Sequence, residues 1–340
     1  MMGKARVLSK FCRPVLVLMV MGAGFQAAAQ EPDVAETPHE RVLELFKKIQ
    51  AAAQELDYSG VYTQYHNGVL LSSRVVHVVD GTGERERVEI LDGSPREFLT
   101  HNDTTQCLIP EHKVVIQQKS AKDRFPSLLL GEPLRIPDHY RVQLDVSRDR
   151  IAGRECMQTE LFPRDVDRYG YRLCTDAQSN LLLRVQTLSP DRNVLEQIVF
   201  TSLDMGDAVK HDLLKPSWDT KEWRVVEAVM APVDLAERGW RIPFPPGFEP
   251  LMQVSRPFSQ GKEVKQLVLT DGLAAISVFI EPYVSANNDV FETRQASAGA
   301  VNIFRTRIGN HWLTALGEVP ALTLRTIAER TEYVPLGNAD

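Results

Sequence analysis

The stretch SGVYTQYHNGVLLSSRVVHVV, Ser59 to Val79, decides the fold class of this chain. It contains two runs rich in β-branched and aromatic residues, which favour strands. The tripeptide His66-Asn67-Gly68 separates the two runs, and Asn-Gly readily adopts the positive φ angles of a tight hairpin turn. The stretch therefore predicts two antiparallel strands, 59–65 and 69–79.

Similar patterns extend to residue 203. They predict further short strands at 85–91, 95–101, 106–109, 114–118, 140–152, 155–162, 168–175, 181–188 and 194–203. On the N-terminal side, Val42, Leu45, Phe46 and Ile49 recur at helical spacing and predict a helix over 39–56. About ten antiparallel strands with one leading helix indicate a large, curved sheet or a partly open barrel.

A second, smaller α+β domain is predicted at 239–335. Its expected strands are 249–258, 264–270, 274–281, 301–307 and 311–316. A helix is expected over 320–330, with Pro320 near its start, where no amide donor is needed. The mixed, proline-containing stretch 213–238 is interpreted as the linker, which leaves 30–212 for the first domain. The predicted fold class is therefore β-rich α+β in two domains.

Residues 1–29 have the three parts of a cleaved secretory signal. Four basic residues and no acidic ones lead into the apolar run Val15–Met21, and Ala27–Ala29 supplies small residues for cleavage before Gln30. The alternative is a membrane anchor, but spanning a bilayer takes about 20 apolar residues. The run from Pro14 to Phe25 is shorter than that. The sequence therefore predicts export, and the four basic residues with a short apolar core favour a bacterial periplasm.

Composition and charge narrow the class of protein further. The chain has 340 residues, is 43% hydrophobic and 25% charged, and carries a net charge of −6. These values are typical of a globular protein of about two domains. Beyond residue 29 the net charge is −10, so the exported part lacks the basic surface that binds phosphate backbones. Nucleic acid is not an expected partner.

Three cysteines follow the predicted signal: Cys107, Cys156 and Cys174. If the hairpin 155–175 is symmetric about Asp165, Cys156 lies directly opposite Cys174. Opposed strand residues have Cα atoms about 4.5–5.5 Å apart, within reach of a disulfide. The sequence therefore predicts a Cys156–Cys174 disulfide, with two buried thiols as the alternative, and leaves Cys107 as a small core residue.

Motifs that concentrate chemistry are missing from the sequence. It contains no nucleophile elbow, zinc-protease motif, phosphate-binding loop or dinucleotide fingerprint. Its histidines are scattered singly, and its carboxylates fall mostly in predicted turns. No catalytic residue, metal site or cofactor is therefore predicted, and binding is favoured over catalysis.

Two groups of apolar residues are candidates for binding. Phe125, Leu128, Leu129 and Leu130 could gate an apolar cavity in a curved sheet, although the sequence favours a role as a core plug. Trp240, Phe244, Phe248 and Phe258 cluster among prolines and could anchor a partner. The same aromatic residues could instead pack the small domain against the first.

The chain also resembles the RseB and MucB family of periplasmic regulators of a stress sigma factor. The resemblance covers about Val42 to Arg330 and depends on the shared order of several short blocks. They are Tyr58-Ser-Gly-Val-Tyr62 with Asn67-Gly68, Asp167-Arg-Tyr-Gly-Tyr171, Pro245-Pro-Gly-Phe248, Asp271-Gly-Leu-Ala274, Ser277-Val-Phe-Ile-Glu-Pro282 and Gly317-Glu-Val-Pro320. The cysteine pair does not contribute to the resemblance.

The resemblance implies a large domain similar to the lipoprotein carriers LolA and LolB, a half-open antiparallel barrel with helices, followed by a small domain. It also implies a non-enzymatic inhibitor that binds the periplasmic part of a transmembrane anti-sigma factor and shields it from proteolysis. Lipid or lipopolysaccharide acyl chains would release it, and a homo-oligomer is compatible with this expectation. The alternative is a periplasmic lipid or lipoprotein carrier without a signalling partner, and an enzyme ranks third.

Overall fold

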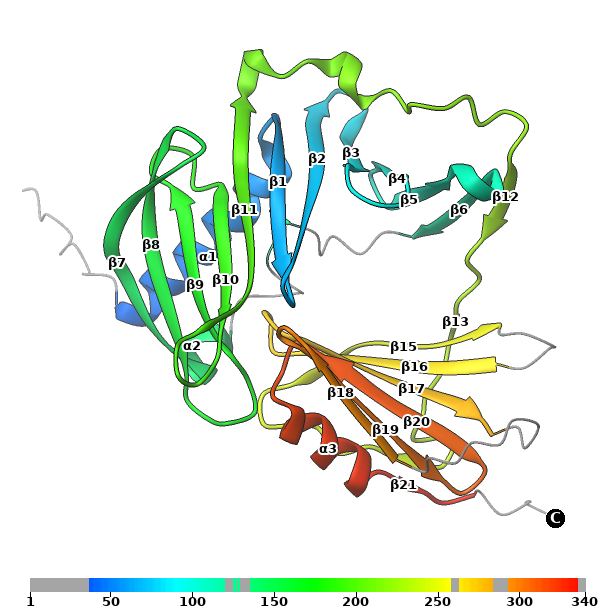
Figure 1. Ribbon diagram of the computed structural model, residues 1–340. Helices are drawn as coiled ribbons and strands as arrows, with labels where there is room; N and C mark the ends of the chain where they lie inside the picture. The colour runs from blue at the N-terminus through cyan, green and yellow to red at the C-terminus, as the bar shows by residue number, and fades with distance from the viewer. Residues whose placement is uncertain are drawn as a thin grey trace, which may run out of the picture. The chain divides into compact units, whose positions relative to one another are not determined.

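A computed structural model of the chain describes residues 37–119, 125–126, 128, 135–257, 263–283 and 293–335. Its N-terminal part begins with helix α1 (Pro38–Glu55) and continues through eleven strands (Figure 1). They are β1 (Tyr58–His66), β2 (Val69–Asp80), β3 (Gly83–Ile90), β4 (Arg96–His101), β5 (Thr104–Ile109), β6 (Val114–Lys119), β7 (Tyr140–Ile151), β8 (Arg154–Pro163), β9 (Gly170–Asp176), β10 (Leu182–Leu188) and β11 (Val194–Met205). Short helical turns lie at Pro110–His112, at α2 (Ile136–His139), at Gly206–Ala208 and at His211–Leu214.

Together with β12 (Arg224–Glu227), these strands form one sheet in the order β12-β6-β5-β4-β3-β2-β1-β11-β10-β9-β8-β7. The predicted hairpin forms as expected, with Gln64 opposite Leu71 and His66 opposite Val69. Strand β1 also pairs with β11, which brings the first and last of the eleven strands together in the middle of the sheet. The order is linear and ends at β12 and β7, so within the described residues the sheet has two edges and is not a closed barrel.

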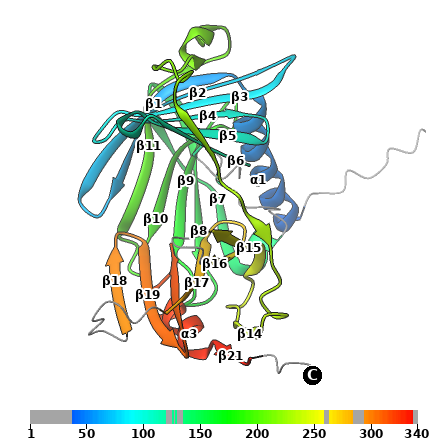
Figure 2. The ribbon, with the colours of Figure 1, turned by 90° about the vertical axis from the view of Figure 1, so that its right-hand side faces the viewer.

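Helix α1 lies along one face of this sheet (Figure 2). Its N-terminus has a capping box, in which Thr37 Oγ1 accepts from the Glu40 amide and Glu40 accepts from the Thr37 amide. Phe46 and Ile49 of its apolar side are fully buried, in one core with residues of β2, β8, β9, β10 and β11. The apolar residues that recur at helical spacing in the sequence therefore lie on the side of α1 that packs against the sheet.

The C-terminal part forms a second sheet in the order β13-β15-β16-β17-β20-β19-β18. Its strands are β13 (Ala231–Pro232), β15 (Glu249–Pro257), β16 (Glu263–Thr270), β17 (Ala275–Pro282), β18 (Thr293–Ala298), β19 (Val301–Ile308) and β20 (His311–Gly317). Helix α3 (Ala321–Arg330) packs against β19 and β20, and β14 (Trp240–Arg241) pairs with β21 (Glu332–Tyr333). Strand β18 was not predicted, because its polar sequence TRQASA lies at a sheet edge and has no apolar alternation.

The stretch interpreted as a linker contains a strand that the sequence analysis missed. Strand β12 (Arg224–Glu227) pairs in parallel with β6, with Arg224 opposite Val114. The expectation of a purely antiparallel sheet is therefore wrong at this edge. All four residues of β12 are exposed, so no alternation of apolar and polar residues could reveal it.

Cys156 and Cys174 form a disulfide, with Cα atoms 5.5 Å apart, but the predicted hairpin register is wrong. Cys156 pairs with Asp176 and Gln158 with Cys174, so the two cysteines lie diagonally rather than directly opposite. Strand β9 starts only at Gly170, because Arg168 and Tyr169 turn toward the C-terminal sheet instead of continuing the strand. Cys107 is half-buried and takes no part in this bond.

Within the described ranges, none of the helices is both long and apolar enough to cross a bilayer. The predicted signal, residues 1–29, lies outside those ranges.

Candidate functional site

The loop between β8 and β9 joins the two sheets through one buried arginine. Arg168 is 1% exposed, and its Nη1 donates to Asp271 Oδ2 over 2.7 Å. Its Nε donates to Asp165 Oδ1 over 3.0 Å, and Nη2 donates to the carbonyl oxygen of Pro246. The guanidinium also lies 4.9 Å from the ring centre of Phe248, within cation–π range. One side chain of the first domain thus contacts three separate points of the second.

The carboxylate of Asp271 accepts hydrogen bonds from residues of both domains. Tyr140 of β7 donates to Asp271 Oδ2 over 2.8 Å, and burial raises the pKa of Tyr140, which keeps its hydroxyl a donor. The other oxygen, Oδ1, accepts from the amides of Leu273 and Ala274. Leu273 follows this turn and packs into the core of the first domain. Buried ionic groups with complete hydrogen bonding fix a single geometry, so these contacts set the pairing of the two sheets.

Three further hydrogen bonds continue the contact. Asn302 donates to Tyr169 Oη over 3.0 Å, and the Ala300 amide donates to Glu196 Oε1 over 3.2 Å. Thr323 of α3 donates to the carbonyl oxygen of Asp167 over 3.1 Å. Four of the blocks that carry the family resemblance meet at this contact: 167–171, 245–248, 271–274 and 317–320.

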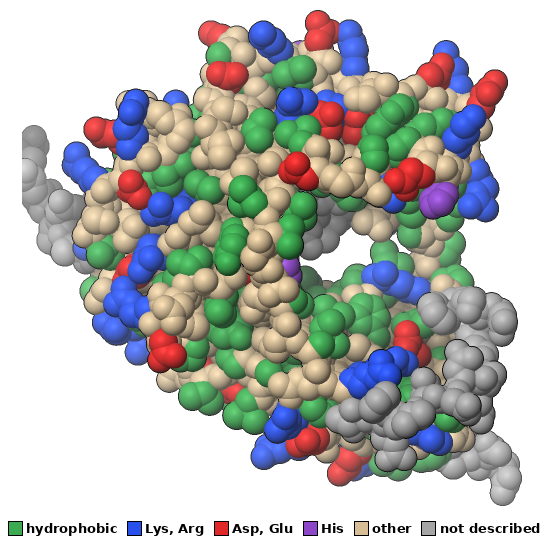
Figure 3. Space-filling model, in the orientation of Figure 1, with side chains coloured by type: hydrophobic (Ala, Val, Ile, Leu, Met, Phe, Trp, Pro, Cys, Tyr) green, Lys and Arg blue, Asp and Glu red, His purple; other side chains and the backbone are tan. Residues whose placement is uncertain are grey.

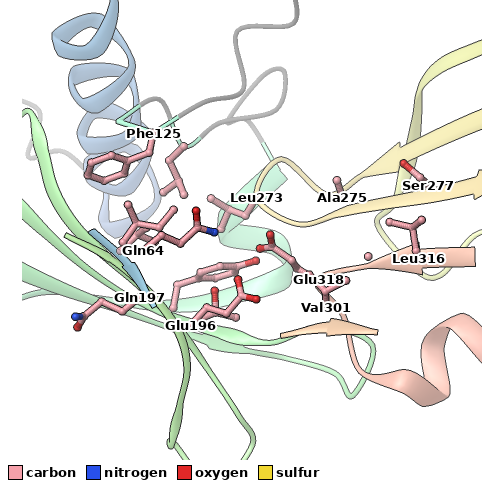
Figure 4. Close-up of a pocket in the computed structure, with 16 residues that line it drawn as sticks. Gln64, Phe125, Glu196, Gln197, Leu273, Ala275, Ser277, Val301, Leu316 and Glu318 are labelled. Carbon is pink, nitrogen blue, oxygen red and sulfur yellow. The ribbon is translucent and has the colours of Figure 1, made fainter. Parts of the chain in front are cut away.

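Beside this contact lies a pocket of about 320 Å³ (Figure 4). Residues of both domains line it, from strands β1, β9, β10 and β11 on one side and β17, β19 and β20 on the other. The lining is Gln64, Phe125, Leu128, Tyr171, Val185, Thr187, Glu196, Gln197, Ile198, Leu273, Ala275, Ser277, Val301, Leu316, Gly317 and Glu318. Its volume is at the lower end of the roughly 300–1,000 Å³ of small-molecule sites. It can take one side chain or one short alkyl chain.

The polar part of the pocket is acidic. Figure 4 shows the carboxyl groups of Glu196 and Glu318 turned toward the same space. Glu196 contacts Nδ1 of His66 and accepts from the Ala300 amide. Desolvation by the surrounding protein and the nearby charge of Glu196 raise the pKa of Glu318 to about 7. Its side chain nevertheless remains in contact with water. The pocket therefore joins an apolar wall to two carboxylates with incomplete charge compensation.

The predicted gate residues border this pocket in part. Phe125 is buried against Tyr62 and Phe200, with ring centres 5.2 and 5.1 Å away, and its edge lines the pocket together with Leu128. Phe125 thus packs into the core, the role that the sequence favoured over a cavity gate, and it also lines this pocket. Leu129 and Leu130 lie outside the described residues.

The four aromatic candidates for partner binding do not form one surface. Trp240 packs on Tyr333 at 4.6 Å, and Phe248 lies beneath Arg168, so both are buried. The alternative role, packing of the small domain against the first, describes Phe248, whereas Trp240 packs within the small domain. Phe244 is 44% exposed, and Phe258 lies outside the described residues.

The sequence analysis did not identify the charged residues of this site as functional residues. Arg168, Asp271 and Glu318 each occur within a block of the resemblance, whereas Glu196 does not. Within the described residues no group of His, Cys, Asp and Glu is arranged to hold a metal ion. On the face seen in Figure 3, acidic and basic side chains are interspersed, without a patch of one sign.

Comparison with known proteins matches both parts of the chain. The model of the MucB/RseB N-terminal domain matches residues 41–218, and that of the MucB/RseB C-terminal domain matches residues 234–332. The sigma factor AlgU regulatory protein MucB of Pseudomonas aeruginosa is 28% identical over 83% of this chain and 87% of the relative. The sigma-E factor regulatory protein RseB of Escherichia coli K12 is 23% identical over 85% of this chain and 90% of the relative.

A crystal structure of MucB in complex with MucA(peri) is similar in fold to this chain. It aligns with a TM-score of 0.68 and 26% identity, over 87% of this chain and all of the solved chain. The aligned part of this chain is long enough to take in both sheets.

Proposed function

Because the chain belongs to the MucB/RseB family, we propose that it restrains an extracytoplasmic-stress sigma factor by binding an anti-sigma factor. The family consists of sigma-factor regulators rather than enzymes. The proposed partner is the periplasmic part of a membrane-spanning anti-sigma factor. Bound protein shields that part from the proteases that would destroy it and free the sigma factor.

One observation carries this proposal. The chain matches both family domains in order, and a MucB that is similar over its whole length was solved with MucA(peri) bound. The contact through Arg168 and Asp271 supports a partner surface built from both domains, because it holds them in one arrangement. We propose that the anti-sigma segment binds along this contact and the small domain.

The proposed location is the periplasm, reached by cleavage of the signal 1–29. The Cys156–Cys174 disulfide supports this location, since disulfides persist in oxidising compartments. Lipid or lipopolysaccharide acyl chains are the proposed releasing signal, received by a half-open large domain like that of the lipoprotein carriers. The apolar wall of Phe125, Leu128 and Leu273 supports an alkyl ligand. Such a ligand lowers the affinity for the anti-sigma factor by no more than the ratio of the ligand's own affinities for the partner-free and the partner-bound protein.

The decisive experiment uses residues 30–340 and the periplasmic segment of the anti-sigma factor from the same organism. It measures the dissociation constant and the rate at which the initiating protease cleaves the segment, with and without lipopolysaccharide. We expect tight binding, slower cleavage, and loss of both on adding lipopolysaccharide. Unchanged cleavage at saturating protein would contradict the proposal.

A carrier without a signalling partner is the competing function, and a cut between the domains separates the two. A protease site inserted after Lys221 is cleaved, and the uncut protein with the same insertion is the matched control. A regulator binds the segment when uncut and loses that binding once the cleaved domains are separated from each other, whereas a carrier keeps its bound lipid and never binds the segment.

A further inference from the structure

The pocket between the two sheets contains one carboxylate that the protein leaves without a partner. Glu318 makes no hydrogen bond or ion pair with any described residue, whereas Glu196 is held by His66 and the Ala300 amide. Both carboxylates turn toward the same space in Figure 4. A second acid beside Glu196 without a cation of its own is costly, since like charges at close range repel.

Tyr171 gives an independent indication of a ligand. This residue of β9 is 2% exposed and lines the pocket, yet its hydroxyl has no hydrogen-bond partner among the described residues. Burial raises the pKa of Tyr171 well above 10, so the hydroxyl stays neutral. Buried hydroxyls are normally hydrogen-bonded, and an unpaired one calls for an explanation. A ligand that donates to this oxygen and to Glu318 accounts for both unpaired groups.

The rest of the lining defines the ligand's other end. Leu128, Leu273 and Leu316 give the pocket an apolar wall, while Gln64 and Ser277 add neutral polar groups. No Lys or Arg is among the lining residues. A site of this size with an apolar wall and acidic groups is complementary to a short alkyl chain that ends in a cation.

From this geometry we propose that the pocket binds an alkyl ammonium or guanidinium group, with Glu318 as the main counter-ion and the Tyr171 oxygen as a second acceptor. The cation has two sources of the same chemistry. It is either a Lys or Arg side chain of the protein partner or a free amine, and only the first source depends on the proposed function.

The test measures binding of n-hexylammonium to residues 30–340 by calorimetry and ligand-observed NMR. 1-Hexanol and hexanoate serve as neutral and anionic analogues of similar size. A charge-assisted hydrogen bond to the Glu318 carboxylate predicts that the ammonium binds at least about tenfold more tightly than the alcohol. Hexanoate is expected to bind most weakly. Equal affinities for all three compounds, or no ammonium binding at millimolar concentrations, would overturn the proposal.

Two variants and one matched control locate the site. Glu318→Gln should reduce ammonium affinity to that of hexanol, and Tyr171→Phe should weaken it by a smaller factor. Glu222→Gln makes the same charge change at an exposed position outside the pocket lining, and should leave affinity unchanged. Equal loss in Glu318→Gln and Glu222→Gln would mean general charge screening and refute the site. Tyr171→Phe keeps the test valid if Glu318→Gln does not fold.

Competition identifies the source of the cation. If the anti-sigma segment supplies it, n-hexylammonium weakens segment binding and Glu318→Gln weakens binding of both. If a free amine is the ligand, the segment binds equally well with and without n-hexylammonium. A segment that does not bind at all refutes the proposed function, while the result with n-hexylammonium alone still decides the site.

Discussion

The guanidinium of Arg168 and the carboxylate of Asp271 form an ion pair at 2.7 Å, and both side chains are completely inaccessible to solvent. The two residues come from different sheets, and Tyr140 and two backbone amides complete the hydrogen bonds of the carboxylate. A buried pair of this kind adds little over an apolar pair of the same shape, but loss of one partner is costly. Arg168 and Asp271 therefore act as a unit.

Arg168→Met should lower the free energy of unfolding by about 3–5 kcal/mol, because it leaves Asp271 charged and buried without its cation. Urea unfolding followed by circular dichroism measures the loss. The double variant Arg168→Met/Asp271→Asn should recover part of it, since no uncompensated charge remains. If the double variant is as unstable as the sum of both single variants, the pair does not act as a unit.

Gly247→Ala should destabilise the protein more than Gly68→Ala. Both glycines have positive φ, at 78° and 79°, so alanine meets the same backbone strain of about 1–2 kcal/mol at each. A methyl group at Gly247 would also overlap the imidazole of His139, whereas the space around Gly68 is empty. Overlap in a packed site adds roughly 1–3 kcal/mol. Thermal unfolding of both variants checks this, and equal shifts in Tm would mean that the loop moves away from His139.

Replacing Cys156 and Cys174 together by serine should cost about 3 kcal/mol, the value expected for a closed loop of this length. The two positions are 18 residues apart, in neighbouring strands. Urea midpoints of the variant and of the reduced parent protein should agree. Cys107→Ser is the control and should change the midpoint by much less, because Cys107 closes no loop.

The contribution of Glu318 to the free energy of unfolding should decrease as the pH rises from about 4.5 to about 7. Its pKa is raised from 4.5 to about 7 in the folded protein, so over this interval the folded state binds the proton more strongly. Desolvation of the carboxyl group is the main cause of the raised pKa, the charge of Glu196 raises it further, and His66 lowers it. Glu318→Gln should remove this pH dependence, and Glu222→Gln should retain it. Urea midpoints at pH 5 and pH 8 provide the measurement, and identical pH profiles for Glu318→Gln and the parent protein would contradict the assignment.

The sequence predicts this fold best where local patterns match the tertiary structure. The predicted helix 39–56 and strands 59–65 and 69–79 agree with α1, β1 and β2 to within one residue at each end, because amphipathic periodicity and Asn67-Gly68 are local signals. The register of the β8–β9 hairpin was wrong because Arg168 and Tyr169 serve distant partners. The pocket could not be predicted, since Glu196 and Glu318 come together only when the two sheets meet.

The pairing of β12 with β6 limits the reach of the chain segment that connects the two sheets. While β12 is paired, only Ala228 to Met230 connect it to β13, and three extended residues reach about 10 Å. Release of Arg224 to Glu227 adds four residues to the connecting chain, which extends its reach by roughly 14 Å. Four exposed residues at a sheet edge thus determine whether the domains are joined by a short, taut connection or by a long, slack one, without unfolding of either core.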